Sequence, residues 1–179
     1  MTGKIFIVGH VKNYSPNAPP PRGLPVQINA FVDASHARNR LNRCSHTGNL
    51  IYLNRSPTIW YSKALKTIET LTFGSEFVAL RLATEIIRGL CYKLHMFCVP
   101  INGPANVLVD NDTVIKNATI PSSILQKKHN SMCYHYVRES VAAGIMRIAF
   151  IPSSENLADM FTKLLGATKL KSFAQRILY

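Results

Sequence analysis

Hydrophobic and polar residues alternate with a short period in the first part of the chain. The runs "VQINAFVDA", "GNLIYLNR" and "TIWYSK" are apolar or alternating over a few residues, which is typical of β-strands. We place a turn at Ser56-Pro57, between the second and third runs. Successive short strands usually pair with their neighbours, so this part predicts three antiparallel strands.

From about Phe73 to Phe97 the period becomes helical. Apolar and small residues recur there at spacings of three and four, as expected for one buried helix face: Phe77, Leu80, Thr84, Ile87, Cys91 and Leu94. Pro100 and the "NGP" turn end the helix. This segment predicts one long helix packed against the sheet.

Strands and helices alternate in the last third of the chain. "ANVLVD" predicts a buried strand and "NDTVIKNA" a short helix, followed by a longer helix from Ile124 to Ala143 that ends at Gly144. "IMRIAFIPS" predicts another strand, and "SSENLADMFTKLL" a helix capped by Ser153 or Ser154. The whole order predicts an α/β fold in which helices cover a mixed sheet.

Proline content separates the beginning of the chain from the rest. Four prolines lie between Ser15 and Arg22, so residues 1–26 are expected to form an extended linker or arm. Residues 27–165 hold the regular pattern and form the expected domain. Residues 166–179 are expected to add a tail with one or two turns of helix.

Charge changes the expected partner. The 179 residues include 21 Lys and Arg against nine Asp and Glu, a formal net charge of +12. This excess favours a polyanionic partner, nucleic acid before an acidic membrane surface, although a generally basic surface explains it too. No apolar run approaches the ~18 residues of a membrane span, so we expect no membrane partner. The four cysteines are widely spaced, which fits a reducing intracellular setting rather than a zinc site.

The few acids stand at particular places. Asp33 and Asp110 end two apolar strands, Glu76 lies near the start of the long helix, and Asp159 lies in the C-terminal helix. If the two strands are neighbours, these carboxylates meet at one sheet edge, where their repulsion favours a divalent cation such as Mg²⁺.

Each acid also has a structural explanation. Asp33 can begin a turn, and Glu76 can favour the positive end of a helix dipole. Asp110 can contribute to a strand-to-helix cap, and Asp159 can be a solvated helix residue. The residues alone leave both interpretations open.

An ordered set of motifs resembles a known family. "FVDAS", "TFGSEFVALRLATE", "VLVDNDTV" and "ENLADMFTK" are similar to the ribonuclease H domain of copia-type LTR retrotransposon Pol polyproteins, and "SHTGNLIYLN" and "KKHNSMCYHYVRE" match between them. The resemblance covers about residues 25–165. It implies the ribonuclease H fold, with a five-stranded mixed sheet of three antiparallel strands followed by parallel additions. The chain has no Y-x-D-D polymerase motif, so we interpret it as the C-terminal part of such a polyprotein.

The family's chemistry is hydrolysis of the RNA strand of an RNA–DNA hybrid. The resemblance implies that Asp33, Glu76, Asp110 and Asp159 are both the catalytic residues and the metal ligands. They would hold two Mg²⁺ ions, for which Mn²⁺ can substitute, in a two-metal displacement. Asp33 is the expected bridging ligand, with Glu76 and Asp110 on one ion and Asp159 on the other.

A hybrid is recognised mainly through phosphates and 2′-hydroxyl groups, so basic and small polar residues are candidate contacts. The candidates are Ser35, Arg38, Arg40, Arg43, Lys63, Lys66, Lys127 and Lys128. For each base the alternative is a solvated surface. A reverse transcriptase domain of the same polyprotein is a further expected partner, and the expected location is a cytoplasmic virus-like particle or the nucleus.

Two other functions remain as alternatives. One is a catalytically inactive retrotransposon remnant that keeps the fold and binds nucleic acid. The other is an integrase-like nuclease on the same fold, which fits less well because such sites normally use three acids in a different arrangement.

Overall fold

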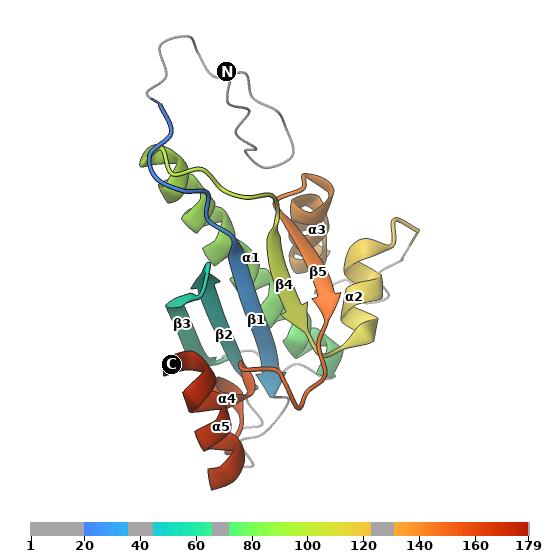
Figure 1. Ribbon diagram of the computed structural model, residues 1–179. Helices are drawn as coiled ribbons and strands as arrows, with labels where there is room; N and C mark the ends of the chain where they lie inside the picture. Colours follow the sequence, from blue (N-terminus) through green and yellow to red (C-terminus); the bar gives the residue numbers. More distant parts are fainter. Residues whose placement is uncertain (1–19, 36–44, 66–71, 123–130, 179) are drawn as a thin grey trace.

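The computed structural model describes residues 20–35, 45–65, 72–122 and 131–178, which build one five-stranded sheet with helices on both faces (Figure 1). The strands are β1 (Ile28–Ser35), β2 (His46–Leu53), β3 (Ser56–Ala64), β4 (Ala105–Val109) and β5 (Met146–Phe150). Their order across the sheet is β3-β2-β1-β4-β5. β1, β2 and β3 are antiparallel neighbours, whereas β4 pairs parallel with both β1 and β5. The prediction of a mixed α/β sheet is confirmed.

The helices form two unequal layers. α1 (Thr72–Met96), α2 (Asp112–Thr119) and α3 (Ser131–Ala142) lie on one side of the sheet, and α4 (Asp159–Thr162) and α5 (Ala167–Leu178) lie on the other (Figure 1). The larger core fills the first side, where buried residues of β1 and β4 meet Phe77 and Leu80 of α1. The smaller core joins Leu50, Leu157 and Phe173 beneath α5. None of the described helices is long and apolar enough to cross a membrane.

The helix prediction for α1 is close to the structure, and Asn111 caps α2 by accepting hydrogen bonds from the Thr113 and Val114 amides. α3 ends where predicted, with Gly144 at a φ of 67°. The part of that predicted helix between Ile124 and Asn130 lies outside the described residues.

The turn of the β2–β3 hairpin was predicted wrongly. It is formed by Asn54 and Arg55, while Ser56 and Pro57 already belong to β3. Asn54 has a φ of 56°, a left-handed conformation that Asn tolerates better than most residues. The conformational freedom of Asn therefore places the turn two residues earlier than the Ser-Pro pair suggests.

The C-terminal segment also differs from the prediction. Residues 153–158 form turns instead of the start of a helix capped by Ser153 or Ser154, and α4 covers only Asp159–Thr162. The cause is a long-range contact, because the Asn156 side-chain amide (Nδ2) donates a hydrogen bond of 3.0 Å to the Val32 carbonyl of β1. The tail helix α5, at 12 residues, is longer than the one or two turns expected.

Candidate active site

Three predicted acids converge at the carboxyl end of β1. Asp33, Asp110 and Asp159 each offer one carboxylate oxygen, and these oxygens lie within 4.8 Å of one another. β1 and β4 are adjacent and parallel, so Asp33 near the end of β1 and Asp110 just after β4 reach the same edge of the sheet. Asp159, the first residue of α4, approaches from the other layer. Asp33 and Asp159 are 3% and 2% exposed, so their charges are almost fully removed from water.

Glu76 faces the same place from α1. It is not one of the three clustered acids, but it lines a groove of about 590 Å³ together with them and Ser35. Burial, and then the charge of Asp110, raise the pKa of Glu76 to about 7, while a hydrogen bond with Asn111 acts in the opposite direction. All four predicted acids therefore line one groove, with Glu76 farther from the other three.

Burial raises the pKa of Asp33 as well. A hydrogen bond from the Thr162 hydroxyl and the charge of Lys163 act against this rise, whereas the neighbouring Asp159 and Asp110 add to it. An added cation would remove much of the penalty of keeping these buried carboxylates charged.

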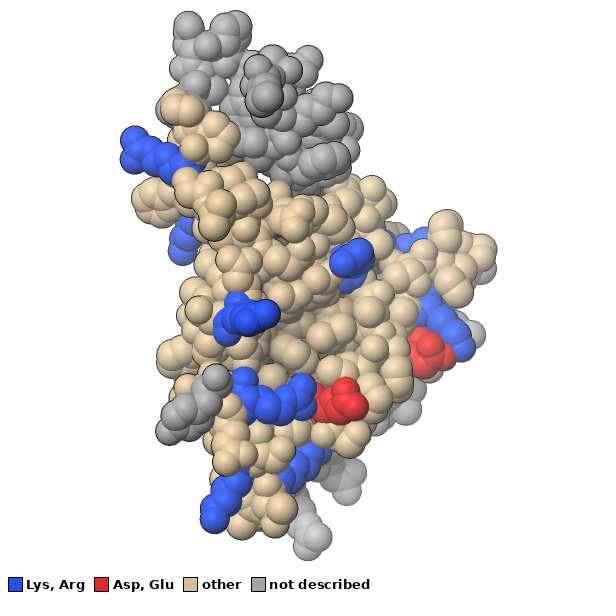
Figure 2. All heavy atoms as spheres, in the orientation of Figure 1, with Lys and Arg blue, Asp and Glu red and all other residues tan. Residues whose placement is uncertain are grey.

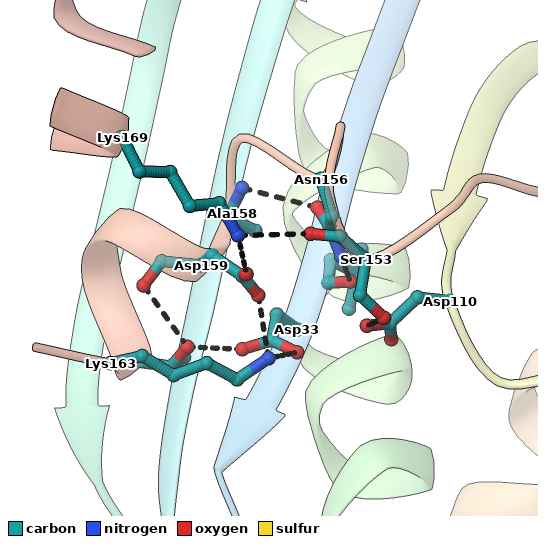
Figure 3. Close-up of polar contacts among 10 residues, drawn as sticks. Asp33, Asp110, Ser153, Asn156, Ala158, Asp159, Lys163 and Lys169 are labelled. Carbon is teal, nitrogen blue, oxygen red and sulfur yellow. Dashed lines mark hydrogen bonds and ion pairs between the residues drawn. The ribbon is translucent and has the colours of Figure 1, made fainter. Parts of the chain in front are cut away.

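Two lysine ammonium groups neutralise part of the acid cluster (Figure 3). Lys163 Nζ lies 3.1 Å from Asp33 Oδ1 and 2.6 Å from Asp159 Oδ1, so it stands where a cation shared by these two residues would stand. Burial lowers the pKa of Lys163, but its contacts with Asp159 and Asp33 outweigh this effect and raise it. Lys169 of α5 approaches the other oxygen of Asp159, at 2.9 Å.

The loop before α4 orients Asp110, the one acid of the cluster that neither of these two lysines contacts. Ser153 Oγ donates a hydrogen bond of 2.7 Å to Asp110 Oδ2, and the Ala158 amide donates one of 3.1 Å to Asn156 Oδ1 (Figure 3). The Asn156 amide in turn holds the loop to β1. The loop therefore ties the orientation of Asp110 to the position of Asp159.

Gly48 lets α4 approach the sheet closely. It is opposite Asp33 in the β1–β2 register. A Cβ atom at Gly48 would lie 2.8 Å from atoms of Phe161 and Thr162 and 3.0 Å from the Ala158 carbonyl oxygen. Any larger residue would push away the helix that carries Asp159.

The candidate nucleic-acid contacts are only partly covered by the structure. Ser35 lines the groove, and its buried hydroxyl has no hydrogen-bond partner among the described residues. Lys63 is exposed on β3 and is not among the residues that line the groove. The other candidates lie outside the described residues: Arg38, Arg40, Arg43, Lys66, Lys127 and Lys128.

Sequence reasoning missed Thr162, Lys163, Lys169 and Ser153, all of which contact the acids. Lys163 carries a detectable signal, since it lies four residues after Asp159 and one helical turn brings the two side chains together. Lys169 gives no such signal, because its distance from Asp159 depends on how α5 packs.

The donor set suits a hard divalent cation. Three carboxylate oxygens within 4.8 Å of one another, with a fourth carboxylate facing the same groove, are the ligand type that Mg²⁺ prefers. The lysine ammonium between two of the acids shows that a positive charge is already accommodated there.

Comparison with known sequences finds retrotransposon polyproteins. No protein-family profile matches the chain. The chain is 25% identical over 156 residues to the retrovirus-related Pol polyprotein from transposon RE1 of Arabidopsis thaliana, which covers 87% of the chain. It is 27% identical over 147 residues to the corresponding polyprotein from transposon TNT 1-94 of Nicotiana tabacum, which covers 80% of the chain. The chain spans 11% of the length of each polyprotein. The resemblance to copia-type Pol polyproteins is confirmed.

Comparison with solved structures identifies the ribonuclease H fold. The N-terminal RNase H domain of rv2228c from Mycobacterium tuberculosis superposes with a TM-score of 0.58 at 14% identity, covering 84% of this chain and 97% of that one. LC11-RNase H1 in complex with RNA/DNA hybrid gives 0.59 at 15% identity, covering 76% and 94%. The foamy viral protease-reverse transcriptase in complex with RNA/DNA hybrid gives 0.53 at 17% identity, covering 85% of this chain and 22% of that one. These superpositions establish the fold, and the predicted ribonuclease H-like fold is confirmed.

Proposed function

We propose that this chain is a ribonuclease H that uses Mg²⁺ to hydrolyse the RNA strand of RNA–DNA hybrids, and that it derives from a copia-type retrotransposon. The observation that carries the proposal is the convergence of Asp33, Asp110 and Asp159, with Glu76 facing them, in a groove at the end of β1. The ribonuclease H fold and the retrotransposon relatives support the same assignment.

The four acids have different proposed roles. Asp33 interacts electrostatically with both Asp159 and Asp110, and it is the proposed ligand shared by two ions. Glu76 and Asp110 are proposed to hold one ion, and Asp159 the other. Two Mg²⁺ ions, or Mn²⁺ in their place, would supply water activation and stabilisation of the leaving oxygen. Ser153 and Thr162 support this chemistry by fixing the orientations of Asp110 and Asp33.

The proposed substrate is a hybrid duplex. Figure 2 shows Lys and Arg side chains spread over the face that carries α5, with far fewer acidic side chains there. Such a surface attracts a phosphate backbone without reading its sequence. Ser35 lines the groove, and its hydroxyl is a proposed contact for a phosphate or 2′-hydroxyl group. Two of the structural neighbours were solved with an RNA/DNA hybrid, which supports this choice.

The cellular context is also a proposal. The relatives are Pol polyproteins, and one structural neighbour joins a protease and a reverse transcriptase. We therefore propose that a reverse transcriptase domain of the same polyprotein is a partner. The proposed locations are a cytoplasmic virus-like particle and the nucleus. Residues 27–165 are the proposed catalytic domain, with residues 1–26 as an arm and 166–179 as a helical tail.

The test is cleavage of a hybrid whose RNA strand is labelled, with Mg²⁺ or with EDTA. The variants are Asp110→Asn, which removes one clustered charge, and Asp112→Asn, which removes an exposed charge two residues away that pairs with Lys116. We expect Mg²⁺-dependent cutting by the wild type and by Asp112→Asn. We expect Asp110→Asn to lose at least about a hundredfold in rate, on the order seen when one electrostatic group of an active site is removed.

Binding of the uncut hybrid is measured in parallel. Equal binding by all three proteins, with no cutting by any of them, would reject the enzyme in favour of the inactive remnant. Equal cutting by Asp110→Asn and the wild type would instead place the catalytic site elsewhere.

A further inference from the structure

The C-terminal helix reaches the acid cluster through one side chain. Lys169, the third residue of α5, lies with its Nζ 2.9 Å from Asp159 Oδ2 and donates to the Ser153 carbonyl oxygen at 3.2 Å. The ammonium also lies 5.0 Å from the ring centroid of Phe173. Phe173 is 3% exposed and anchors α5 in the smaller core with Leu50 and Leu157. The packing of α5 therefore determines where this positive charge is held.

All four carboxylate oxygens of Asp33 and Asp159 accept hydrogen bonds from side chains of residues 162–169. Lys163 binds Oδ1 of both Asp33 and Asp159, Lys169 binds Asp159 Oδ2, and the Thr162 hydroxyl binds Asp33 Oδ2. A divalent ion that binds either carboxylate approaches oxygens that already accept hydrogen bonds, and it enters the field of the two ammonium groups beside them. The two ammonium groups thus occupy positions for which a metal ion competes.

The Lys169 ammonium can leave the acid cluster more easily than the Lys163 ammonium. Lys163 is bound between both acids, whereas Lys169 contacts Asp159 alone among them. The two side chains are similarly exposed, at 34% and 37%, so the difference lies in the number of acids that each one binds. Rotation of the lysine stem can move the ammonium into solvent while Phe173 stays in the core. The long, flexible side chain makes this exchange possible without unfolding α5.

We propose that Lys169 is a tethered counter-cation, which holds Asp159 in the metal-free protein and lowers the affinity of the site for divalent ions. The inference rests on the proposed function, because it assumes that Asp159 is a metal ligand. An ammonium group this close to the carboxylate stabilises its charge and repels an incoming cation. α5 would thereby set the ion concentration at which the site fills.

The test measures metal affinity separately from catalysis. Mn²⁺ binding is measured by isothermal titration calorimetry for the wild type, Lys169→Met and Lys171→Met. Lys171 is exposed on the same helix, so its variant matches the loss of charge outside the cluster. We expect Lys169→Met to bind Mn²⁺ about tenfold more tightly, equivalent to about 1.4 kcal/mol, and Lys171→Met to stay within about twofold of wild type.

Thermal unfolding provides a second readout, because the variant is expected to be less stable than the wild type without metal and to gain more stability from Mn²⁺. In EDTA, Lys169→Met should melt at a lower temperature than the wild type, because Asp159 has lost a neutralising partner. With saturating Mn²⁺ its melting temperature should rise by more than that of the wild type, because the stabilisation by a bound ligand increases with the logarithm of its affinity. Lys169→Arg keeps the charge and should restore the wild-type affinity.

Unchanged or weaker Mn²⁺ binding by Lys169→Met would overturn the inference and leave Lys169 as a support for Asp159. That result does not affect the proposed function if the wild type still binds Mn²⁺ and Asp110→Asn does not. A wild type that binds no Mn²⁺ would overturn the inference and the proposed metal site together.

Discussion

Because Gly48 packs closely against α4, the effect of Gly48→Ala on stability and activity can be predicted quantitatively. The added Cβ would lie 2.8 Å from Phe161 Cβ and from Thr162 Cγ2. Carbon atoms in ordinary contact lie about 3.5–4.0 Å apart, so α4 has to move by about 0.7 Å or more. The position of Phe161 Cβ is fixed by the backbone, so no side-chain rotation relieves that contact.

The displacement should affect stability and activity together. Overpacking of this kind typically costs about 1–3 kcal/mol, and we expect the free energy of unfolding to fall by about 2 kcal/mol. Asp159 and Thr162 move with α4, so the acid cluster loses its geometry. A displacement of about 1 Å in an active site can reduce the rate about a hundredfold, and we expect at least a tenfold loss in hybrid cleavage.

Chemical denaturation and the cleavage assay measure the two effects. Gly89→Ala is the matched control, since Gly89 is exposed in α1 and an added Cβ there meets nothing within 4 Å. It should stabilise the protein by up to about 1 kcal/mol through helix propensity and leave cleavage unchanged. If Gly48→Ala were as stable and as active as the wild type, the close packing of α4 against β2 would be wrong.

Two further variants test buried polar groups. The raised pKa of Glu76 means that the metal-free folded protein binds its proton more tightly than the unfolded chain, so this contribution to stability is full below about pH 4.5 and is lost as the pH rises through about 7. Glu76→Gln should remove that part of the pH dependence of unfolding in EDTA, and an unchanged profile would show that another group causes it. Asn49 is fully buried in β2, and its side-chain amide has no hydrogen-bond partner among the described residues. Asn49→Leu should therefore raise the free energy of unfolding by about 1 kcal/mol, whereas a loss would reveal a buried water that satisfies the amide.

The positions of Asp33, Asp110 and Glu76 within their strands and helix were predictable from local signals. Asp33 and Asp110 each end an apolar run, and the parallel pairing of β1 with β4 brings such ends together. Glu76 lies near the start of a helix whose apolar periodicity fixes which side faces the sheet. For these residues a strand or helix assignment almost determines the position of the side chain.

The surroundings of Asp159 were not predictable in the same way. The segment from Ser153 to Ala158 has a helical pattern, but the hydrogen bond from Asn156 to Val32 joins residues 124 positions apart and replaces the first helical turns. Lys169 reaches Asp159 only because Phe173 packs against the sheet. The spacing of Leu170, Phe173 and Ile177 indicates an amphipathic α5, but it does not say where the helix docks.

The most direct test of the account is anomalous diffraction from crystals of the protein grown with Mn²⁺. We expect an anomalous peak within about 2–2.5 Å of carboxylate oxygens of Asp33 and Asp110, and we expect the Lys163 ammonium to have moved away from Asp33. The same crystals of Asp110→Asn should lack the peak. A wild-type map with the lysines still on the acids and Mn²⁺ bound only elsewhere would contradict the assignment of these four acids as a metal-dependent active site.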